Sequence, residues 1–273
     1  MKKDNKHKSY FGLPQDVKFC SKCVISNQRP SSTIEFLNSI NVEKEVINFN
    51  NKNLCSACEY NKIKETIDWE QRHEELKKIC NQIKKDRKNS TDYDCVIPGS
   101  GGKDSAFTSH ILKYKYGLNP LTVTWAPHLY TDIGSKNFES WLHVGGFDNI
   151  LFTPNGKLHR HLTKLAFSNL LHPFQPFIIG QKIIGPLIAK KFNIPHVFYG
   201  ENQAEYGNNI KDNSNTKMED KFFSTKKNTE DLYLGGEQIK NIIKSSEYKI
   251  EDFKPYIPLD NNFIKENNIG VYY

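Results

Sequence analysis

The fold is decided by the stretch Val96-Ile97-Pro98-Gly99-Ser100-Gly101-Gly102-Lys103-Asp104-Ser105. Residues 93–97 are β-prone and mostly apolar, as expected of a buried strand. A helical pattern begins at Ser105 and ends at Gly117. The glycines between strand and helix allow a tight turn, which directs several backbone N–H groups to one point at the positive end of the helix. The stretch therefore predicts a phosphate-binding site, and Lys103 adds a mobile positive charge.

This turn differs from a Walker A loop. That motif needs a glycine separated by four residues from Gly-Lys, and Ser or Thr after the lysine. Here Ile97 and Asp104 occupy those two positions. Residues 100–105, Ser-Gly-Gly-Lys-Asp-Ser, instead resemble the signature of the PP-loop ATP pyrophosphatases, which split ATP between its α and β phosphates. The alternative is an ordinary strand-turn-helix corner, but six matched residues between a strand and a helix favour ATP binding.

Apolar β-prone runs alternate with helical patterns downstream of this loop. The order predicts an α/β fold with a doubly wound parallel sheet. In such sheets ligands lie beyond the carboxyl ends of the strands, so the loop, the segment after Trp125 and Gly200-Glu201-Asn202 should meet there. Residues 203–230 are polar and predict a long loop that acts as a lid. The expected strands are 121–125, 149–152 and 196–199, and the expected helices are 138–144, 158–171, 179–192 and 237–245.

Four of the six cysteines form Cys-x-x-Cys pairs: Cys20 with Cys23, and Cys55 with Cys58. In a reducing compartment, two such pairs indicate a tetrahedral metal site rather than disulfides. Zinc suits four thiolates, and an iron–sulfur cluster is the alternative. Residues 33–36 and 46–49 predict the two strands of a hairpin in a zinc ribbon. Cys80 and Cys95 lie in apolar patterns and are expected to be buried, inert thiols.

Three regions follow from these patterns: an N-terminal zinc-ribbon module (1–62), a helical connector (63–92) and a PP-loop domain (93–273). Residues 1–16 are polar. The connector helix should begin at Asp68, whose side chain can cap it in a capping-box pattern with Gln71.

The composition is that of a globular protein, with 37% hydrophobic and 25% charged residues among 273. The basic N-terminus lacks an apolar signal-peptide region, and no apolar run approaches the roughly 20 residues of a membrane span. A cytoplasmic location without membrane contact is therefore expected. The net charge is +7, but the lysines are spread along the chain, which favours a solvated surface over a nucleic-acid partner.

Segments along nearly the whole chain are similar to the N-acetyl sugar amidotransferases of bacterial surface-sugar pathways. The similar segments are the two Cys-x-x-Cys pairs, residues 98–105, His172-Pro173-Phe174-Gln175-Pro176-Phe177 with Gly180-Gln181, residues 198–202 with 204–207, 233–236 and 256–259. The resemblance implies conversion of an acetamido group to an acetamidino group: ATP adenylates the amide oxygen, and ammonia displaces AMP. It also implies a glutaminase subunit and an ammonia-channel barrel subunit as partners. Members of this family usually continue beyond the position of Tyr273, so a further C-terminal segment is expected.

The candidate site residues follow from the motifs and the resemblance together. Lys103 is expected to stabilise the leaving pyrophosphate, and Asp104 either to hold Mg²⁺ or to anchor the loop. Glu201 is the third catalytic candidate; Glu201 and Glu205 are candidates for Mg²⁺ or for positioning ammonia. The expected ATP-binding residues are Ser100, Gly101, Gly102, Lys103, Asp104, Ser105, Thr124, Trp125 and Gly200, and the expected contacts to the N-acetylated sugar substrate are His172, Gln175, Asn202 and Glu205.

Two other functions remain open at this point. A PP-loop tRNA thiolase can also carry a Cys-x-x-Cys module, but it needs an RNA-binding surface and usually cysteines near the loop. A non-catalytic scaffold could recruit partners through the zinc ribbon alone. Intact Lys103 and Asp104 favour an enzyme over the scaffold.

Overall fold

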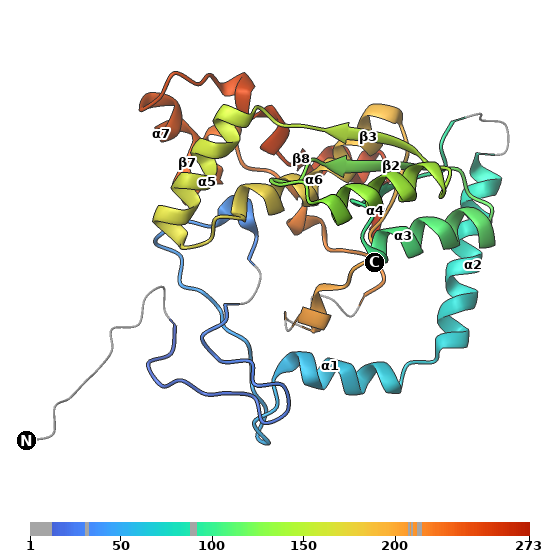
Figure 1. The fold of residues 1–273 in the computed structure, drawn as a ribbon, viewed down its shortest axis with the longest axis horizontal. Helices are drawn as coiled ribbons and strands as arrows, with labels where there is room; N and C mark the ends of the chain where they lie inside the picture. The colour runs from blue at the N-terminus through green and yellow to red at the C-terminus, as the bar shows by residue number, and fades with distance from the viewer. Residues whose placement is uncertain (1–12, 31–32, 88–91, 207, 209, 212–214) are drawn as a thin grey trace, which may run out of the picture.

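A parallel sheet of five strands lies at the centre of this computed structural model (Figure 1). The structure describes residues 13–30, 33–87, 92–206, 208, 210–211 and 215–273. The polar start (1–12), part of the connector (88–91) and Gly207 of the similar segments lie outside these residues. The strand order is β3-β2-β1-β4-β9, and every pairing between neighbours is parallel. The strands are β1 (Cys95–Pro98), β2 (Pro120–Trp125), β3 (Asp148–Phe152), β4 (His196–Phe198) and β9 (Gly270–Tyr272). This arrangement confirms the predicted α/β fold with a parallel sheet.

Side chains of the central strands alternate between two hydrophobic clusters because successive residues in a strand point to opposite faces. Val96 and Val197 belong to the larger cluster, which contains buried apolar residues of helix α6 (Gln175–Phe192). Ile97 and Phe198 belong to a second cluster with Cys80 of helix α2 (Trp69–Asp86). Both sheet faces are therefore covered, which explains why these strands are continuous apolar runs in the sequence.

Most helices lie close to their predicted positions, but α4 (Asp132–His143) begins well before the predicted start at 138. Asp68 caps α2 through its side chain, which accepts a hydrogen bond from the N–H of Gln71; the Gln71 amide turns instead to Glu75, so the reciprocal half of the capping box is not formed. Helix α3 (Lys103–His110) continues as a π-helical turn, η2 (Ile111–Lys115), before Gly117. The other helices are α1 (Ser56–Glu65), α4 (Asp132–His143), α5 (Gly156–Leu170), α7 (Ile239–Lys244) and α8 (Asn261–Glu266). No helix in the described part of the chain is both long and apolar enough to cross a bilayer.

The predicted hairpin in the N-terminal segment is wrong. Residues 35–37 form a 3-10 turn, η1 (Glu35–Leu37), and isolated bridges join Pro30 to Val46 and Phe49 to Cys55. Residues 33–36 do not form a strand, and Phe36 packs instead in the large hydrophobic cluster of the sheet domain. In Figure 1, α1 and the blue N-terminal coils lie on the opposite side of the molecule from β2 and β3.

Residues 207, 209 and 212–214 of the predicted loop over 203–230 lie outside the described residues. The described part of this segment has more regular structure than the predicted free loop. It contains short turns, and Met218, Phe222 and Phe223 are buried in the large cluster. Apolar anchors at these positions are incompatible with one long free lid, so only parts of this segment line the site. The short elements here and downstream are η3 (Gln203–Tyr206), η5 (Asp220–Phe222), β5 (Ser224–Thr225), η6 (Thr229–Asp231), β6 (Tyr233–Leu234), β7 (Glu237–Gln238), η7 (Ile250–Tyr256) and β8 (Leu259–Asp260).

Candidate functional site

The glycine-rich turn leaves the first turn of α3 open to a ligand. Gly102 is the N-cap residue, and no side chain caps the helix. The first helical hydrogen bond is donated by the N–H of Ala106 to Gly102, so the N–H groups before it have no intrahelical acceptor. Gly101 adopts a φ of 81°, which a residue with a side chain rarely reaches. The geometry suits an anion at this point.

Two charged residues follow the turn with different exposure. The side chain of Lys103 is 87% exposed, and its Nζ lies 2.6 Å from Oδ1 of Asp104. This hydrogen bond raises the pKa of Lys103. Asp104 faces a cavity, whereas Lys103 does not line it. Lys103 is therefore a mobile cation at the mouth of the site.

The cavity beyond the loop has a volume of about 410 Å³. Glu201, after β4, lines it together with Asp104. Burial raises the pKa of Glu201, and the negative charge of Asp104 raises it further, while Lys103 opposes this shift. Gly200 lets this segment approach α3, because a Cβ there would lie 2.6 Å from the carbonyl oxygen of Asp104. Two carboxylates close enough to repel each other, beside an anion-binding turn, fit a hard cation such as Mg²⁺ held together with phosphates.

The cavity lining includes most of the predicted loop residues together with groups that sequence patterns did not indicate. Ser100, Gly102, Asp104, Ser105, Trp125, Gly200 and Glu201 line it, as predicted for residues that meet at the strand ends. The residues that were missed are Arg29, Glu35, Gln181, Lys182, Tyr206 and Asn208. Lys182 had one signal in the sequence, because it is a single charged residue between the apolar residues of α6.

Contact with adenine would need exposed side chains, whereas those of Thr124 and Trp125 are buried. The Thr124 hydroxyl accepts a hydrogen bond from the Asn149 amide, and Thr124 borders a separate cavity of about 120 Å³ together with Ser100. Trp125 is 3% exposed, and its ring packs directly on Gly180, where a Cβ would come within 2.3 Å. Its Nε1 has no hydrogen-bond partner among the described residues. Any contact of Trp125 with a ligand is thus limited to a small part of the ring.

Asn202 and Glu205 lie on the other side of Gly200, in a neighbouring cavity of about 750 Å³. Glu205 pairs with Lys64 of α1 at 2.8 Å. Asn202 accepts a hydrogen bond from the N–H of Ala204 through its side chain. Asn202 and Glu205, which were expected to contact the sugar, therefore do not line the cavity beside the phosphate-binding turn.

Gln175 requires a correction. Its side chain is fully buried: Nε2 donates to the carbonyl of Glu35 at 2.8 Å, and Oε1 accepts from the N–H of Gly235 at 2.9 Å. His172 lies behind Glu35, with its Nε2 3.9 Å from the carboxylate. Neither Gln175 nor His172 lines the cavity. Gln175 is a structural link between α6, η1 and the β6–β7 turn, rather than a sugar contact.

Gln175→Leu is expected to destabilise the fold without changing substrate affinity of the folded protein. It leaves the buried N–H of Gly235 without its acceptor, at a cost of roughly 1–3 kcal/mol. It also removes one of the two hydrogen bonds that the Glu35 carbonyl accepts, the other being from the N–H of Asn38. Urea unfolding measures this loss. Gln181→Leu, on the same helix but exposed to the cavity, is the matched control and should leave the free energy of unfolding nearly unchanged. Equal stability of Gln175→Leu and the native protein would contradict the structural role.

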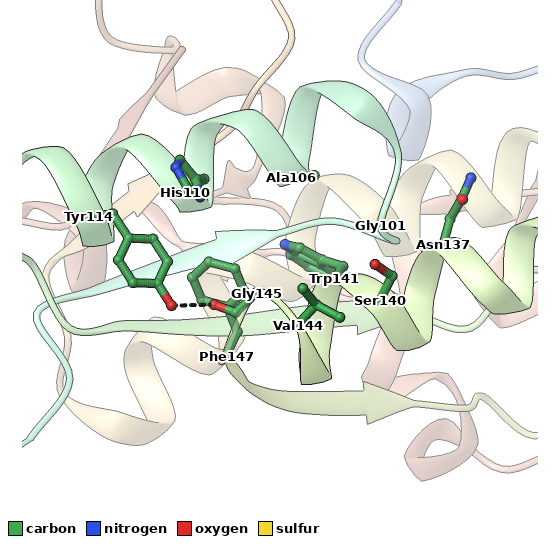
Figure 2. A pocket seen from close by; sticks show the side chains of 10 residues that line it. All are labelled: Gly101, Ala106, His110, Tyr114, Asn137, Ser140, Trp141, Val144, Gly145 and Phe147. Atoms are coloured by element: carbon green, nitrogen blue, oxygen red, sulfur yellow. Dashed lines mark hydrogen bonds between the residues drawn. The ribbon is translucent and has the colours of Figure 1, made fainter.

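A further cavity, of about 430 Å³, lies behind the loop between α3 and α4 (Figure 2). Figure 2 shows Tyr114 donating a hydrogen bond to the carbonyl of Gly145 across this space, at 2.8 Å. Gly101 is the residue of the phosphate-facing turn that borders it. Trp141 closes its floor and donates from Nε1 to Ser109. Asp104 and Glu201 do not line it, so this cavity is separate from the candidate site.

The two Cys-x-x-Cys pairs converge in the N-terminal segment. The four Sγ atoms lie within 4.8 Å of one another, with Cys20 to Cys58 at 3.9 Å and Cys23 to Cys55 at 3.5 Å. A tetrahedral zinc site with Zn–S bonds of about 2.3 Å needs Sγ separations of about 3.8 Å. The four cysteines therefore fit a metal ion of this size.

The thiols of this cluster differ in their tendency to ionise. Burial raises the pKa of Cys58 to about 12, and the neighbouring thiols add to this. For Cys20, burial is outweighed by N–H groups of Cys55, Cys23 and Lys22, which bring the pKa down to about 6. A bound cation would favour the thiolate form of all four, and its binding would release protons.

Comparisons with known proteins give limited similarity. No protein-family model matches the chain. An uncharacterized protein of Methanocaldococcus jannaschii is 35% identical over 80 residues, which is 29% of this chain and 27% of that protein. The NH₃-dependent NAD synthetase of Campylobacter jejuni, solved in complex with nitrate, is similar with a TM-score of 0.38 and 18% identity. That similarity covers 51% of this chain and 59% of the synthetase chain.

Proposed function

We propose that this chain is an ATP-dependent amidotransferase that converts the acetamido group of an N-acetylated sugar to an acetamidino group. The observation that carries the proposal is the shared cavity: the open first turn of α3, which carries Asp104, lines the same space of about 410 Å³ as Glu201. The Ser-Gly-Gly-Lys-Asp-Ser resemblance supports ATP as the nucleotide, and the further similar segments support the N-acetyl sugar.

The proposed reaction overcomes the poor reactivity of an amide. The amide oxygen attacks the α phosphorus of ATP, the bond to the β-phosphate oxygen breaks, and pyrophosphate leaves. Ammonia then adds to the activated carbon, the C–O bond breaks with AMP as leaving group, and a proton is lost to give the amidine. Backbone N–H groups of the turn and Lys103 stabilise the charge that accumulates on pyrophosphate.

The two carboxylates have proposed roles in the same cavity. Asp104 and Glu201 would hold Mg²⁺, which would neutralise phosphate charge when bound. In the alternative role, Glu201 would accept a proton from the attacking ammonia, and burial raises its pKa above that of an ordinary glutamate, toward neutral pH. The cavity walls keep the reacting groups together and limit access of water.

The metal of the cysteine cluster is proposed to be structural zinc. Four thiolates and no open ligand position are typical of structural rather than catalytic zinc. Its role would be to hold the N-terminal segment in shape, and with it Arg29 and Glu35 at the cavity wall.

Ammonia is proposed to come from outside the chain, from a glutaminase delivered through a channel-bearing barrel subunit. A glutaminase needs an accessible nucleophile. Cys80 and Cys95 are fully buried, and burial raises the pKa of both thiols. Their burial also disfavours the tRNA thiolase reading, because sulfur transfer needs an accessible thiol.

Incubation with ATP, ammonium at high concentration and a panel of free and nucleotide-linked N-acetylhexosamines tests this function. We expect an amidine with oxygen replaced by NH, detected by mass spectrometry, together with AMP and pyrophosphate. Glutamine in place of ammonium should give no product. ADP as the nucleotide product, or amidine formation from glutamine by the purified chain alone, would refute the proposal. Bulk tRNA in the same assay distinguishes the thiolase alternative.

A further inference from the structure

The cavity that the phosphate-binding turn lines also carries two charged groups from distant parts of the chain. Glu35 comes from η1 in the N-terminal segment, and Lys182 comes from α6. The side chain of Glu35 is 8% exposed, yet it lines the cavity. Its contacts are long: the Asn38 amide donates to Oε2 at 3.4 Å, and His172 Nε2 lies 3.9 Å from Oε1. Within the described part of the chain, these are the contacts of the carboxylate, so most of its hydrogen-bonding capacity is unused there.

Lys182 is similarly free of polar partners. Among the residues that the structure describes, its ammonium group forms no ion pair or hydrogen bond. The ring of Phe222 lies near it, with 5.4 Å from Nζ to the ring centre. Burial lowers the pKa of Lys182, while the charge of Glu35 opposes this shift. An acceptor and a donor thus face the same space without satisfying each other.

Unsatisfied charged groups at a partly buried wall are costly unless a ligand or water completes their hydrogen bonds. The surface around them is apolar, with Phe177, Ile184 and Met218 in the lining. A ligand that carries both hydroxyl donors and a carbonyl acceptor on a compact apolar frame satisfies these requirements. An anionic group at Glu35 would be repelled, so the part of the ligand held there should be uncharged.

We propose that Glu35 and Lys182 form the acceptor-binding side of the cavity, which takes an uncharged polyhydroxylated amide. Glu35 accepts hydrogen bonds from hydroxyl groups of the ligand, and Lys182 donates to its oxygen atoms. The phosphates of ATP would bind at the first turn of α3, which lines the same cavity, so the two substrates would share one space. This inference rests on the proposed amidotransferase function and assigns the residues that select its second substrate.

The N-terminal segment is held against this site by two contacts with η3. The guanidinium of Arg29 donates to the carbonyl of Tyr206, and Lys64 pairs with Glu205 at 2.8 Å. Gln175 fixes η1 itself through the carbonyl of Glu35. The cysteine-rich segment is therefore part of the acceptor wall, not only a separate structural module.

The first test separates the two substrates by kinetics and binding, with Glu35→Gln and Lys182→Met in the full chain. We expect KM for the N-acetylhexosamine that supports AMP formation to rise at least tenfold in both variants. The Kd of a non-hydrolysable ATP analogue, measured by calorimetry, should stay within twofold of the native value. The matched controls are Glu43→Gln and Lys191→Met, both at exposed positions, which should change neither quantity. An unchanged KM, or a parallel loss of affinity for the ATP analogue, would overturn the assignment and place ribose at this wall.

A second test does not need turnover, so its failure is distinct from failure of the proposed function. Lys182 should react with fluorodinitrobenzene at pH 8 faster than Lys191 does, as mapped by mass spectrometry of peptides, because its amine is more often neutral. Glu35→Gln should increase the labelling rate of Lys182 further, since it removes the charge that favours the ammonium form. At least one N-acetylhexosamine of the panel should slow this labelling threefold or more. Three results would overturn the proposal. They are slower labelling of Lys182 with ATP but with none of the sugars, no slowing by any sugar of the panel, and an unchanged labelling rate in Glu35→Gln.

Discussion

Lys103→Ala is expected to lower the rate of AMP formation by roughly 10²–10³-fold while changing the affinity for ATP much less. The physical reason is that negative charge on pyrophosphate grows as the bond to the α phosphorus breaks, so a cation at the mouth of the site stabilises the transition state more than the ground state. The side chain is 87% exposed, and its partner among the described residues is Asp104. Its removal should therefore leave the free energy of unfolding unchanged.

Single-turnover measurements with saturating ATP, followed by separation of AMP, check this expectation. Lys226→Ala removes an exposed lysine away from the cavity and should keep the native rate.

The pH profile is a second readout. The positive charge of Lys103 lowers the pKa of Glu201, so this pKa should be higher in the variant. If the reaction needs the ionised form of Glu201, the rate of the variant should rise at a higher pH than that of the native protein. Full turnover in Lys103→Ala would show that the assigned role is wrong.

Cys58→Ser is expected to abolish stoichiometric metal binding and to loosen the N-terminal segment. Binding of structural zinc contributes roughly 10–16 kcal/mol in small zinc modules, and here few strand pairings support the segment. The native chain should contain one zinc per molecule by elemental analysis. The variant should contain almost none, and limited proteolysis should cut it within residues 13–60.

Cys80→Ser is the matched control because Cys80 is buried but lies outside the cluster. It should keep the metal while losing some stability from the core. Loss of metal should also raise KM for the acceptor, because the metal-bound segment carries Glu35. A metal-free native chain, iron with visible absorbance, or an equimolar metal content in Cys58→Ser would contradict the zinc assignment.

Local patterns predicted the sheet and the loop because both depend on residues that are close in the chain. The run Val96 to Ser105 contains its own strand, turn and helix start, so its conformation follows from nearby residues. The alternating strands are buried on both faces, which produces the apolar runs that identify them.

The same reasoning failed where distant segments decide the outcome. Phe36 was expected in a hairpin, but it contributes to the core of the sheet domain, and this burial favours a 3-10 turn over strand pairing. Gln175 was expected to contact sugar because it lies in a similar segment, yet Glu35 and Gly235 use its side chain. Glu35 and Lys182 face one cavity only after folding, so no spacing in the sequence joins them.

The sheet order also has a consequence for synthesis of the protein on the ribosome. Strand β9 pairs with β4 through His196 to Phe198, and it supplies Val271 and Tyr272 to the two clusters. Until residues 270–272 leave the exit tunnel, one edge of β4 has no neighbour in the sheet, and both apolar faces are incomplete beside it. Nascent chains that have completed β4 but not β9 thus expose an unpaired strand edge, the kind of surface that aggregates. Chaperones should bind the translating chain in this interval and leave when β9 docks.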